Sequence, residues 1–161
     1  ISNPYLPRPP GGSSGKFPDE CLQWHNYYRA KHGVPLLKLS SKLCSYAQEW
    51  ANHLAKTDSF QHRSDRKYGE NIYMSWSSDP TVQISGKVPV DSWYSEIKDY
   101  TFGKEPRSLS SGHFTQVVWR SSTELGVAQA RSKTNKIIVV ANYNPAGNMV
   151  GSFAANVPPP K

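Results

Sequence analysis

One segment of the chain has a hydrophobic spacing that fits a single type of secondary structure. Between residues 43 and 54 the apolar residues recur three or four positions apart: Leu43, Ala47, Trp50, Ala51 and Leu54. Because an α-helix has 3.6 residues per turn, these side chains form one stripe that must be buried against another layer. Ser40 or Ser41 can cap the start of the helix. The segment therefore predicts an amphipathic helix that covers a core.

Three further helices are predicted from weaker signals. Pro18 and the acidic residues after it favour a helix that begins at Phe17, and Gly33 ends that helix. A helix is also expected over residues 90–100, and a short one over residues 112–119. The longer of these two has three large residues on its expected buried side: Trp93, Ile97 and Tyr100.

Strand patterns lie between and after these helices. Residues 69–74 are predicted as a short strand. Residues 125–130 and 136–143 are predicted as an antiparallel pair, joined by a polar turn at residues 132–135. Helices that precede and interrupt a few antiparallel strands imply an α/β (α+β) domain in which helices cover a sheet.

The length and composition of the chain limit its domain organisation. Its 161 residues suffice for one domain with one core. Residues 1–16 are rich in Pro, Gly and Ser and show no periodicity, so they are predicted to form a flexible tail. Residues 17–161 are predicted to form the folded domain. No stretch approaches the roughly 20 apolar residues that a membrane span requires.

Basic residues exceed acidic ones. The chain has 19 Lys and Arg against 12 Asp and Glu, which gives a net charge of +7. Such an excess favours anionic partners such as phospholipid head groups, acidic glycans or nucleic acid. The basic residues are scattered and no nucleic-acid-binding motif is present, so nucleic acid is not an expected partner. The alternative is a solvated basic surface without a specific partner.

The chain has only two cysteines, Cys21 and Cys44, and both fall in predicted helices. Two thiols can form neither a disulfide-rich scaffold nor a zinc site built from cysteines. They are expected to be buried free thiols, with a disulfide between the two helices as the alternative.

Two histidines and two glutamates are candidates for a polar site. His62 and His113 lie among small polar residues, whereas Glu70 and Glu96 lie in apolar or aromatic surroundings. A carboxylate in such surroundings is costly unless it meets a cation or hydrogen-bond donors, so each glutamate is expected to face a partner. Taken alone, a histidine is more often a hydrogen-bonded structural residue than a ligand.

Four short motifs, in this order, resemble those of the CAP superfamily (cysteine-rich secretory, antigen 5 and plant pathogenesis-related type 1 proteins). They are HNYYR at residues 25–29, GEN at 69–71, GHFTQVVW at 112–119 and VVANYNPAGN at 139–148. The resemblance covers residues 17–157. Within the superfamily the chain is most similar to the Golgi-associated plant pathogenesis-related group, through KHGVP at residues 31–35, WYSEIK at 93–98 and PAGN at 145–148.

One position departs from the pattern of the secreted members. They usually have Cys where this chain has Ala141, and their other disulfide cysteines are also missing here. This departure weakens the expectation of a toxin-like or allergen-like secreted protein. Two locations stay open: outside the cell after removal of a signal peptide, or the cytosolic face of the Golgi or other membranes.

The resemblance implies a three-layer α-β-α sandwich with a mainly antiparallel central sheet. It also implies a cleft that contains His62, Glu70, Glu96 and His113. There the two histidines can hold a divalent metal, with zinc expected, as a labile and optional cofactor. The two glutamates are expected as direct or water-mediated partners of the metal.

Members of the superfamily bind lipids, so the resemblance further implies a lipid- or sterol-binding domain that associates with membranes. Anionic lipids or a sterol are then the expected partners. Four residues in and after the strand at 69–74 are candidates to line an apolar groove: Tyr73, Trp76, Val82 and Ile84. The alternative is that this long loop only covers the core.

Two other functions stay open beside lipid binding. The chain can be a metal-dependent hydrolase, a peptidase in particular, with Glu70 or Glu96 activating a water molecule on the metal. It can also be a protein-interaction module with a vestigial cleft, forming a homodimer or binding another protein. Surface aromatic residues such as Trp24 or Tyr27 would then make the contact.

Overall fold

The structure is a computed structural model, and it describes residues 16–161. The flexible tail predicted over residues 1–16 therefore lies outside the described residues, apart from Lys16. Within residues 16–161, no helix combines the length and the apolar character that crossing a membrane would need.

A four-stranded sheet forms the middle layer of the molecule. Its strands lie in the order β1-β3-β4-β2. β1 runs parallel to β3, whereas β4 is antiparallel to both of its neighbours, so the expected mainly antiparallel sheet is confirmed. The strands are β1 (Lys38–Leu39), β2 (Gly69–Trp76), β3 (Glu124–Arg131) and β4 (Lys136–Asn144).

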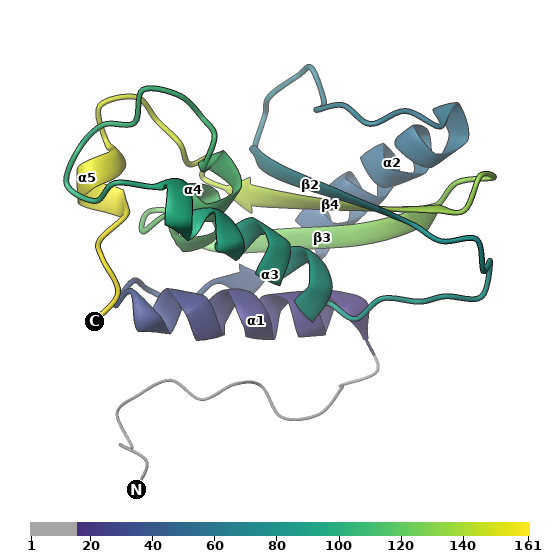
Figure 1. Cartoon of the computed structure of the whole chain (residues 1–161), viewed down its shortest axis with the longest axis horizontal. Helices are drawn as coiled ribbons and strands as arrows, with labels where there is room; N and C mark the ends of the chain where they lie inside the picture. Colours follow the sequence, from purple (N-terminus) through teal and green to yellow (C-terminus); the bar gives the residue numbers. More distant parts are fainter. Residues whose placement is uncertain (1–15) are drawn as a thin grey trace, which may run out of the picture.

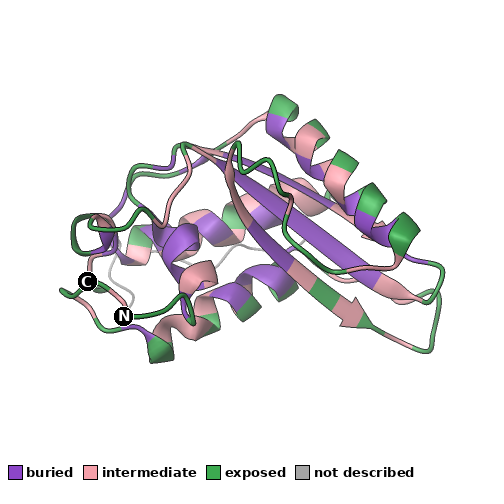
Figure 2. Cartoon of the chain, turned by 90° about the horizontal axis from the view of Figure 1, so that it is seen from above, coloured by how far each residue is buried: buried purple, intermediate pink, exposed green. Residues whose placement is uncertain are grey.

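Helices cover both faces of this sheet (Figure 1). α2 (Ser41–Thr57) buries its apolar stripe against one face, where Ile72, Ile138 and Val140 meet it. The other face is covered by the remaining long helices, namely α1 (Phe17–Lys31), α3 (Lys87–Tyr94) and α4 (Gly112–Val118). Strands β3 and β4 are therefore largely buried between the layers (Figure 2). The predicted α-β-α sandwich is confirmed.

The helix predicted over residues 90–100 is wrong in its extent. α3 ends at Tyr94 and continues as a tighter 3-10 helix, η1 (Ser95–Asp99), after which Tyr100 has an extended backbone. Ile97 is only half-buried, whereas Trp93 and Tyr100 are buried as expected. The change of helix type falls where Glu96 bonds the first amides of α4. A tertiary contact thus overrides the helical pattern here.

Two short elements have no counterpart in the predictions. β1 contains two residues, and α5 (Phe153–Asn156) contains four. Neither is long enough to show a hydrophobic period. After α5 the chain is extended and returns to the end of α1, where the amide of Lys161 donates to the carbonyl of Lys31 over 2.8 Å.

The two cysteines are free thiols. Cys21 is buried on α1, with its Sγ 3.6 Å from the carbonyl oxygen of Gly86, and Cys44 on α2 is half-buried. Burial raises the pKa of both thiols, so both remain protonated. They act as small apolar residues of the packing between helices and sheet.

A buried arginine fixes α1 to the loop that follows α4. The guanidinium of Arg29 donates to the carbonyl oxygens of Val117, Trp119 and Ser122 over 2.8–3.0 Å, and also to that of Pro35. Burial lowers the pKa of Arg29 to about 10, so it stays charged at neutral pH. Carbonyl oxygens on two segments compensate that charge, which holds the C-terminal end of α4 in place.

Candidate functional site

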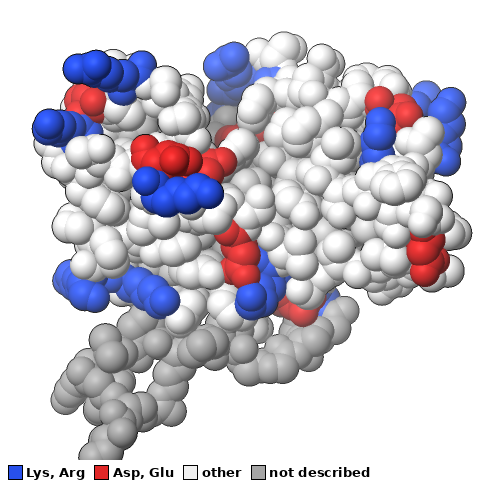
Figure 3. Space-filling model, in the orientation of Figure 1, with Lys and Arg blue, Asp and Glu red and all other residues white. Residues whose placement is uncertain are grey.

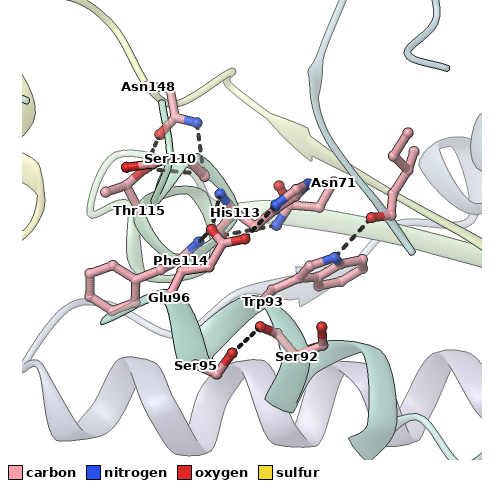
Figure 4. Close-up of polar contacts among 12 residues, drawn as sticks. Asn71, Ser92, Trp93, Ser95, Glu96, Ser110, His113, Phe114, Thr115 and Asn148 are labelled. Atoms are coloured by element: carbon pink, nitrogen blue, oxygen red, sulfur yellow. Dashed lines mark hydrogen bonds and ion pairs between the residues drawn. The ribbon is translucent and has the colours of Figure 1, made fainter. Parts of the chain in front are cut away.

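A cavity of about 470 Å³ opens where the start of β2 meets α4 and the end of β4. His62, Glu70 and His113 line it, together with Asn71 and Asn142. Three of the four residues predicted for the site therefore lie in one cavity. The fourth, Glu96, is not part of the cavity lining and lies behind His113 (Figure 4).

The first histidine–glutamate pair is formed within a short stretch of chain. Nδ1 of His62 lies 2.9 Å from Oε1 of Glu70, and the same oxygen accepts the backbone amide of Arg63 over 3.0 Å. The Glu70 side chain is 9% exposed, whereas that of His62 is 55% exposed. Glu70 is held by its place in β2, opposite Asn142 of β4, while His62 lies in the preceding loop.

The second pair connects two elements that are distant in sequence. Oε2 of Glu96, on η1, lies 2.8 Å from Nδ1 of His113, on α4 (Figure 4). Its Oε1 accepts the backbone amides of His113 and Phe114 over 2.9 and 3.2 Å. A carboxylate at the first amides of a helix satisfies donors that have no partner within the helix. Glu96 therefore fixes the imidazole of His113 and the helix end that carries it.

Both pairs determine which ring nitrogen can meet a metal. A carboxylate oxygen only accepts, so Nδ1 of each imidazole carries the proton, and Nε2 presents its lone pair. Within residues 16–161 no group of three or more His, Cys, Asp or Glu side chains is arranged to hold a metal ion. A metal here would take Nε2 of His62 and of His113 as its protein ligands. In this geometry the glutamates orient the histidines.

A buried series of hydrogen bonds, from Asn71 through Tyr143 to His25, supports the backbone of His113. Nδ2 of Asn71 donates to the carbonyl of His113 over 3.1 Å and also lies 3.2 Å from the hydroxyl of Tyr143. That hydroxyl lies 2.6 Å from Nε2 of His25, whose Nδ1 donates to the carbonyl of Cys21 over 2.7 Å. Because Nδ1 carries the proton, Tyr143 donates to Nε2. Burial lowers the pKa of His25 to about 4, which keeps it neutral.

None of these three supporting residues was predicted from the sequence. Asn71, Tyr143 and His25 all lie in the motifs that carry the family resemblance, at residues 69–71, 139–148 and 25–29. The signal was therefore present. A motif alone does not show that three segments meet at one buried hydrogen-bond chain.

Close contacts between two glycines and the side chain of Gln116 shape the remaining wall of the cavity. A Cβ at Gly69 would clash with Oε1 of Gln116, and one at Gly147 would lie 2.7 Å from Nε2 of the same side chain. Gln116 in turn accepts the amide of Gly147 over 2.9 Å. Oδ1 of Asn148 accepts the hydroxyl of Thr115 over 2.6 Å and so connects the segment after β4 to α4 (Figure 4). Both glycines are needed for this close approach.

The four residues proposed for an apolar groove do not lie in the cavity. Tyr73 and Ile84 are partly buried against the main core, and Val82 is half-buried. Trp76 differs from them, since it is 63% exposed at the end of β2. Covering the core accounts for Tyr73 and Ile84 but not for the exposed Trp76. The aromatic residues proposed for protein contacts, Trp24 and Tyr27, pack edge to face on α1 with ring centres 5.3 Å apart.

Residues 22–143 match the family model CAP, described as the cysteine-rich secretory protein family. The chain therefore belongs to the CAP family. It is 43% identical over 154 residues to the Golgi-associated plant pathogenesis-related protein 1 of Homo sapiens, a match that covers 92% of this chain and 97% of the relative.

Solved structures with the same fold include two that cover most of both chains. BmVAL-1 matches with a TM-score of 0.70 and 26% identity, covering 88% of this chain and 82% of the other. NaASP2, in a crystal structure with Zn²⁺, matches with a TM-score of 0.68 and 25% identity, covering 88% and 85% of the two chains.

Proposed function

We propose that the cleft binds one divalent metal ion, with zinc expected, through Nε2 of His62 and Nε2 of His113. The observation that carries this proposal is the pair of carboxylates, one on Nδ1 of each imidazole, at 2.9 and 2.8 Å. A carboxylate on the second nitrogen is the usual partner of a metal-binding histidine, because it fixes the tautomer and the ring orientation. The crystal structure of the relative NaASP2 with Zn²⁺ supports the same choice of metal.

A binding role agrees better with this arrangement than turnover does. Two imidazoles are fewer protein ligands than structural or catalytic zinc sites usually have, so the ion is expected to exchange readily. A hydrolase needs a carboxylate that is free to accept a proton from water. Both oxygens of Glu96 already accept hydrogen bonds, and Oε1 of Glu70 accepts two. Of these four oxygens, only Oε2 of Glu70 has no hydrogen-bond partner among the described residues, so a hydrolase would have to rely on Glu70 alone.

Calorimetric titration of metal-free protein with zinc tests the proposal. One site is expected in the unaltered chain, and none in the double variant His62→Ala/His113→Ala. The matched control is His53→Ala, since His53 is exposed on α2 outside the cavity and should leave the site intact. Folded protein that shows no heat of binding with zinc, nickel or copper would contradict the proposal. Peptide turnover that the double variant loses would favour the peptidase instead.

A second candidate function is association with anionic membranes. It is favoured by the net charge of +7 together with Trp76, an exposed indole of the kind that lies at membrane interfaces. Flotation with anionic vesicles over a series of salt concentrations tests it, since electrostatic binding falls steeply with salt. Vesicles with sterol separate a second mode, which should persist at high salt and fail in Val82→Asp. Protein that binds neither lipid would leave the protein-interaction module as the leading function.

A further inference from the structure

A second cavity lies away from the histidines, between α2 and the turn that joins β3 to β4. It has a volume of about 460 Å³ and is open to solvent. Ala55 and Ala130 form its apolar part, and their small side chains leave the hollow. The rest of the lining is polar or basic: Asn52, Lys56, Arg131 and Lys133. The guanidinium of Arg131 donates to the carbonyl of Val82, on the opposite face of the sheet from Ala130. Two lysines and one amide therefore face this cavity without a carboxylate.

The two lysines are not neutralised by neighbouring acids. None of the ion pairs within residues 16–161 includes Lys56 or Lys133. An acidic residue close in sequence, Asp58, is already engaged. It lies 3.3 Å from Nζ of Lys136 and accepts the hydroxyl of Thr134 over 2.9 Å. Positive charge at this cavity is thus left for a partner outside the chain.

An exposed tryptophan lies at the same end of the sheet. The indole of Trp76 donates to the carbonyl of Thr134 over 3.0 Å, which fixes the ring beside the β3–β4 turn. Met74, two residues earlier on β2, is also exposed. Basic side chains surround the turn in the space-filling view, with a few acidic ones among them (Figure 3). An exposed apolar pair beside uncompensated cations is the combination that a bilayer interface accommodates.

We propose that this end of the molecule is the surface that binds an anionic bilayer. Lys56 and Lys133 bind lipid phosphates in the cavity, and Trp76 inserts at the level of the head groups. This proposal rests on the second candidate function, membrane association, and gives it a location. A soluble phosphate would use the cations but gives no role to Trp76 and Met74, and for this reason the partner is a membrane.

The proposed surface is separate from the histidine cleft. Glu70 lies near the first residue of β2, and Trp76 is its last residue. At about 3.3 Å per residue, six residues of strand place the two about 20 Å apart. A membrane bound at the β3–β4 turn therefore leaves the cleft open to solvent. Metal binding and membrane binding can be measured independently of each other.

A charge-matched pair of variants tests the location. Lys56→Glu/Lys133→Glu reverses two cations of the cavity. Lys38→Glu/Lys42→Glu reverses two exposed lysines near the other end of α2, outside the cavity and without ion pairs among the described residues. Each Lys→Glu changes the charge by two, so both variants lower +7 by four, to +3. Any difference between them therefore reflects position and not net charge.

Partitioning is measured on vesicles of phosphatidylcholine with about 30% phosphatidylserine, a fraction chosen to give an anionic surface. The cavity variant is expected to bind at least about tenfold more weakly than the charge-matched control. Trp76→Ala is expected to weaken the binding that remains at high salt. Zinc titration of each variant is expected to be unchanged, which shows that the domain is still folded.

The outcomes separate the two proposals. If the unaltered chain does not bind these vesicles, membrane association itself is wrong. If it binds and the two charge variants weaken it equally, the location is wrong and membrane association stands. Competition by glycerol phosphate at the same concentration as lipid phosphate would assign the cavity to a soluble anion and overturn the membrane as its partner.

Discussion

The two histidine–glutamate pairs have the same first contact but very different support. His62 and Glu70 are eight residues apart, and Glu70 uses a single oxygen for the imidazole and for one backbone amide. Glu96 and His113 are 17 residues apart, and Glu96 uses both oxygens, for the imidazole and for two amides of α4. Asn71 also holds the backbone carbonyl of His113. The side of the cleft that carries His113 is thus fixed from two other elements, η1 and β2. The side that carries His62 is held by local contacts with Glu70.

This difference gives the two histidines different roles in a metal site. His113 is placed by the core, because Glu96 on η1 bonds its ring and its helix, and Asn71 on β2 bonds its carbonyl. His62 lies in a loop and is more than half exposed, so its ring can adjust to an ion or a ligand. A site with one fixed and one adjustable ligand exchanges its metal more easily than a site with two fixed ligands.

Acidification is expected to have the largest effect on the free energy of unfolding. It acts through His25, at the end of the hydrogen-bond chain that supports His113. The pKa of His25 is about 4 in the folded chain because burial disfavours its charged form, whereas an exposed imidazole has a pKa of about 6.5. The unfolded chain therefore binds the extra proton first. The stabilisation is complete above pH 6.5 and is lost as the pH falls from 6.5 to 4, by about 3 kcal/mol.

Urea unfolding of the unaltered chain and of His25→Gln, at pH 7 and at pH 4.5, measures this loss of stability. Glutamine can donate to the carbonyl of Cys21 or accept from Tyr143, but it does not titrate. The variant should lose less stability on acidification than the unaltered chain. Burial also lowers the pKa of His32, which contributes in the same direction and stays in both proteins. Equal losses in the two proteins would show that His25 does not titrate on unfolding.

Truncation of the two glutamates should have the next largest effect, and it should be unequal. Glu96→Ala leaves the amides of His113 and Phe114 and the imidazole without acceptors, and is expected to cost about 2 kcal/mol of unfolding free energy. Glu70→Ala removes one oxygen whose two donors, His62 and Arg63, lie in a loop, and it is expected to cost about 1 kcal/mol. Chemical denaturation of both variants at pH 7 gives the difference. A larger loss for Glu70→Ala would contradict the proposed asymmetry.

The sequence predicted the fold well where a hydrophobic period was long enough to read. The stripe on α2 and the apolar runs of β3 and β4 belong to elements of eight or more residues, and all three elements are present. The β1 strand and the α5 helix were missed because two or four residues show no period. The break between α3 and η1 was missed for another reason. It depends on the contact of Glu96 with α4, which no local pattern contains.

The candidate site was predictable only in part. Two isolated carboxylates in apolar surroundings indicated that each needs a partner, and the structure pairs each with one histidine. The sequence did not show that both glutamates contact Nδ1. That detail distinguishes a residue that orients a ligand from one that binds the metal. The support from Asn71, Tyr143 and His25 depends on how β2, β4 and α1 meet, so it needed the fold.

The smallest expected effect is the most specific test of the asymmetry. In Glu96→Gln, the amide oxygen is needed by the two backbone amides of α4, so the NH₂ group must face His113. The imidazole then has to accept on Nδ1, which moves its proton to Nε2, the nitrogen a metal would need. Glu70→Gln has no such conflict, since one oxygen already serves both His62 and Arg63, and the amide oxygen can take its place. Zinc affinity by calorimetry is therefore expected to fall about tenfold in Glu96→Gln and about twofold in Glu70→Gln. Equal losses would mean that the tautomer of His113 does not control metal binding.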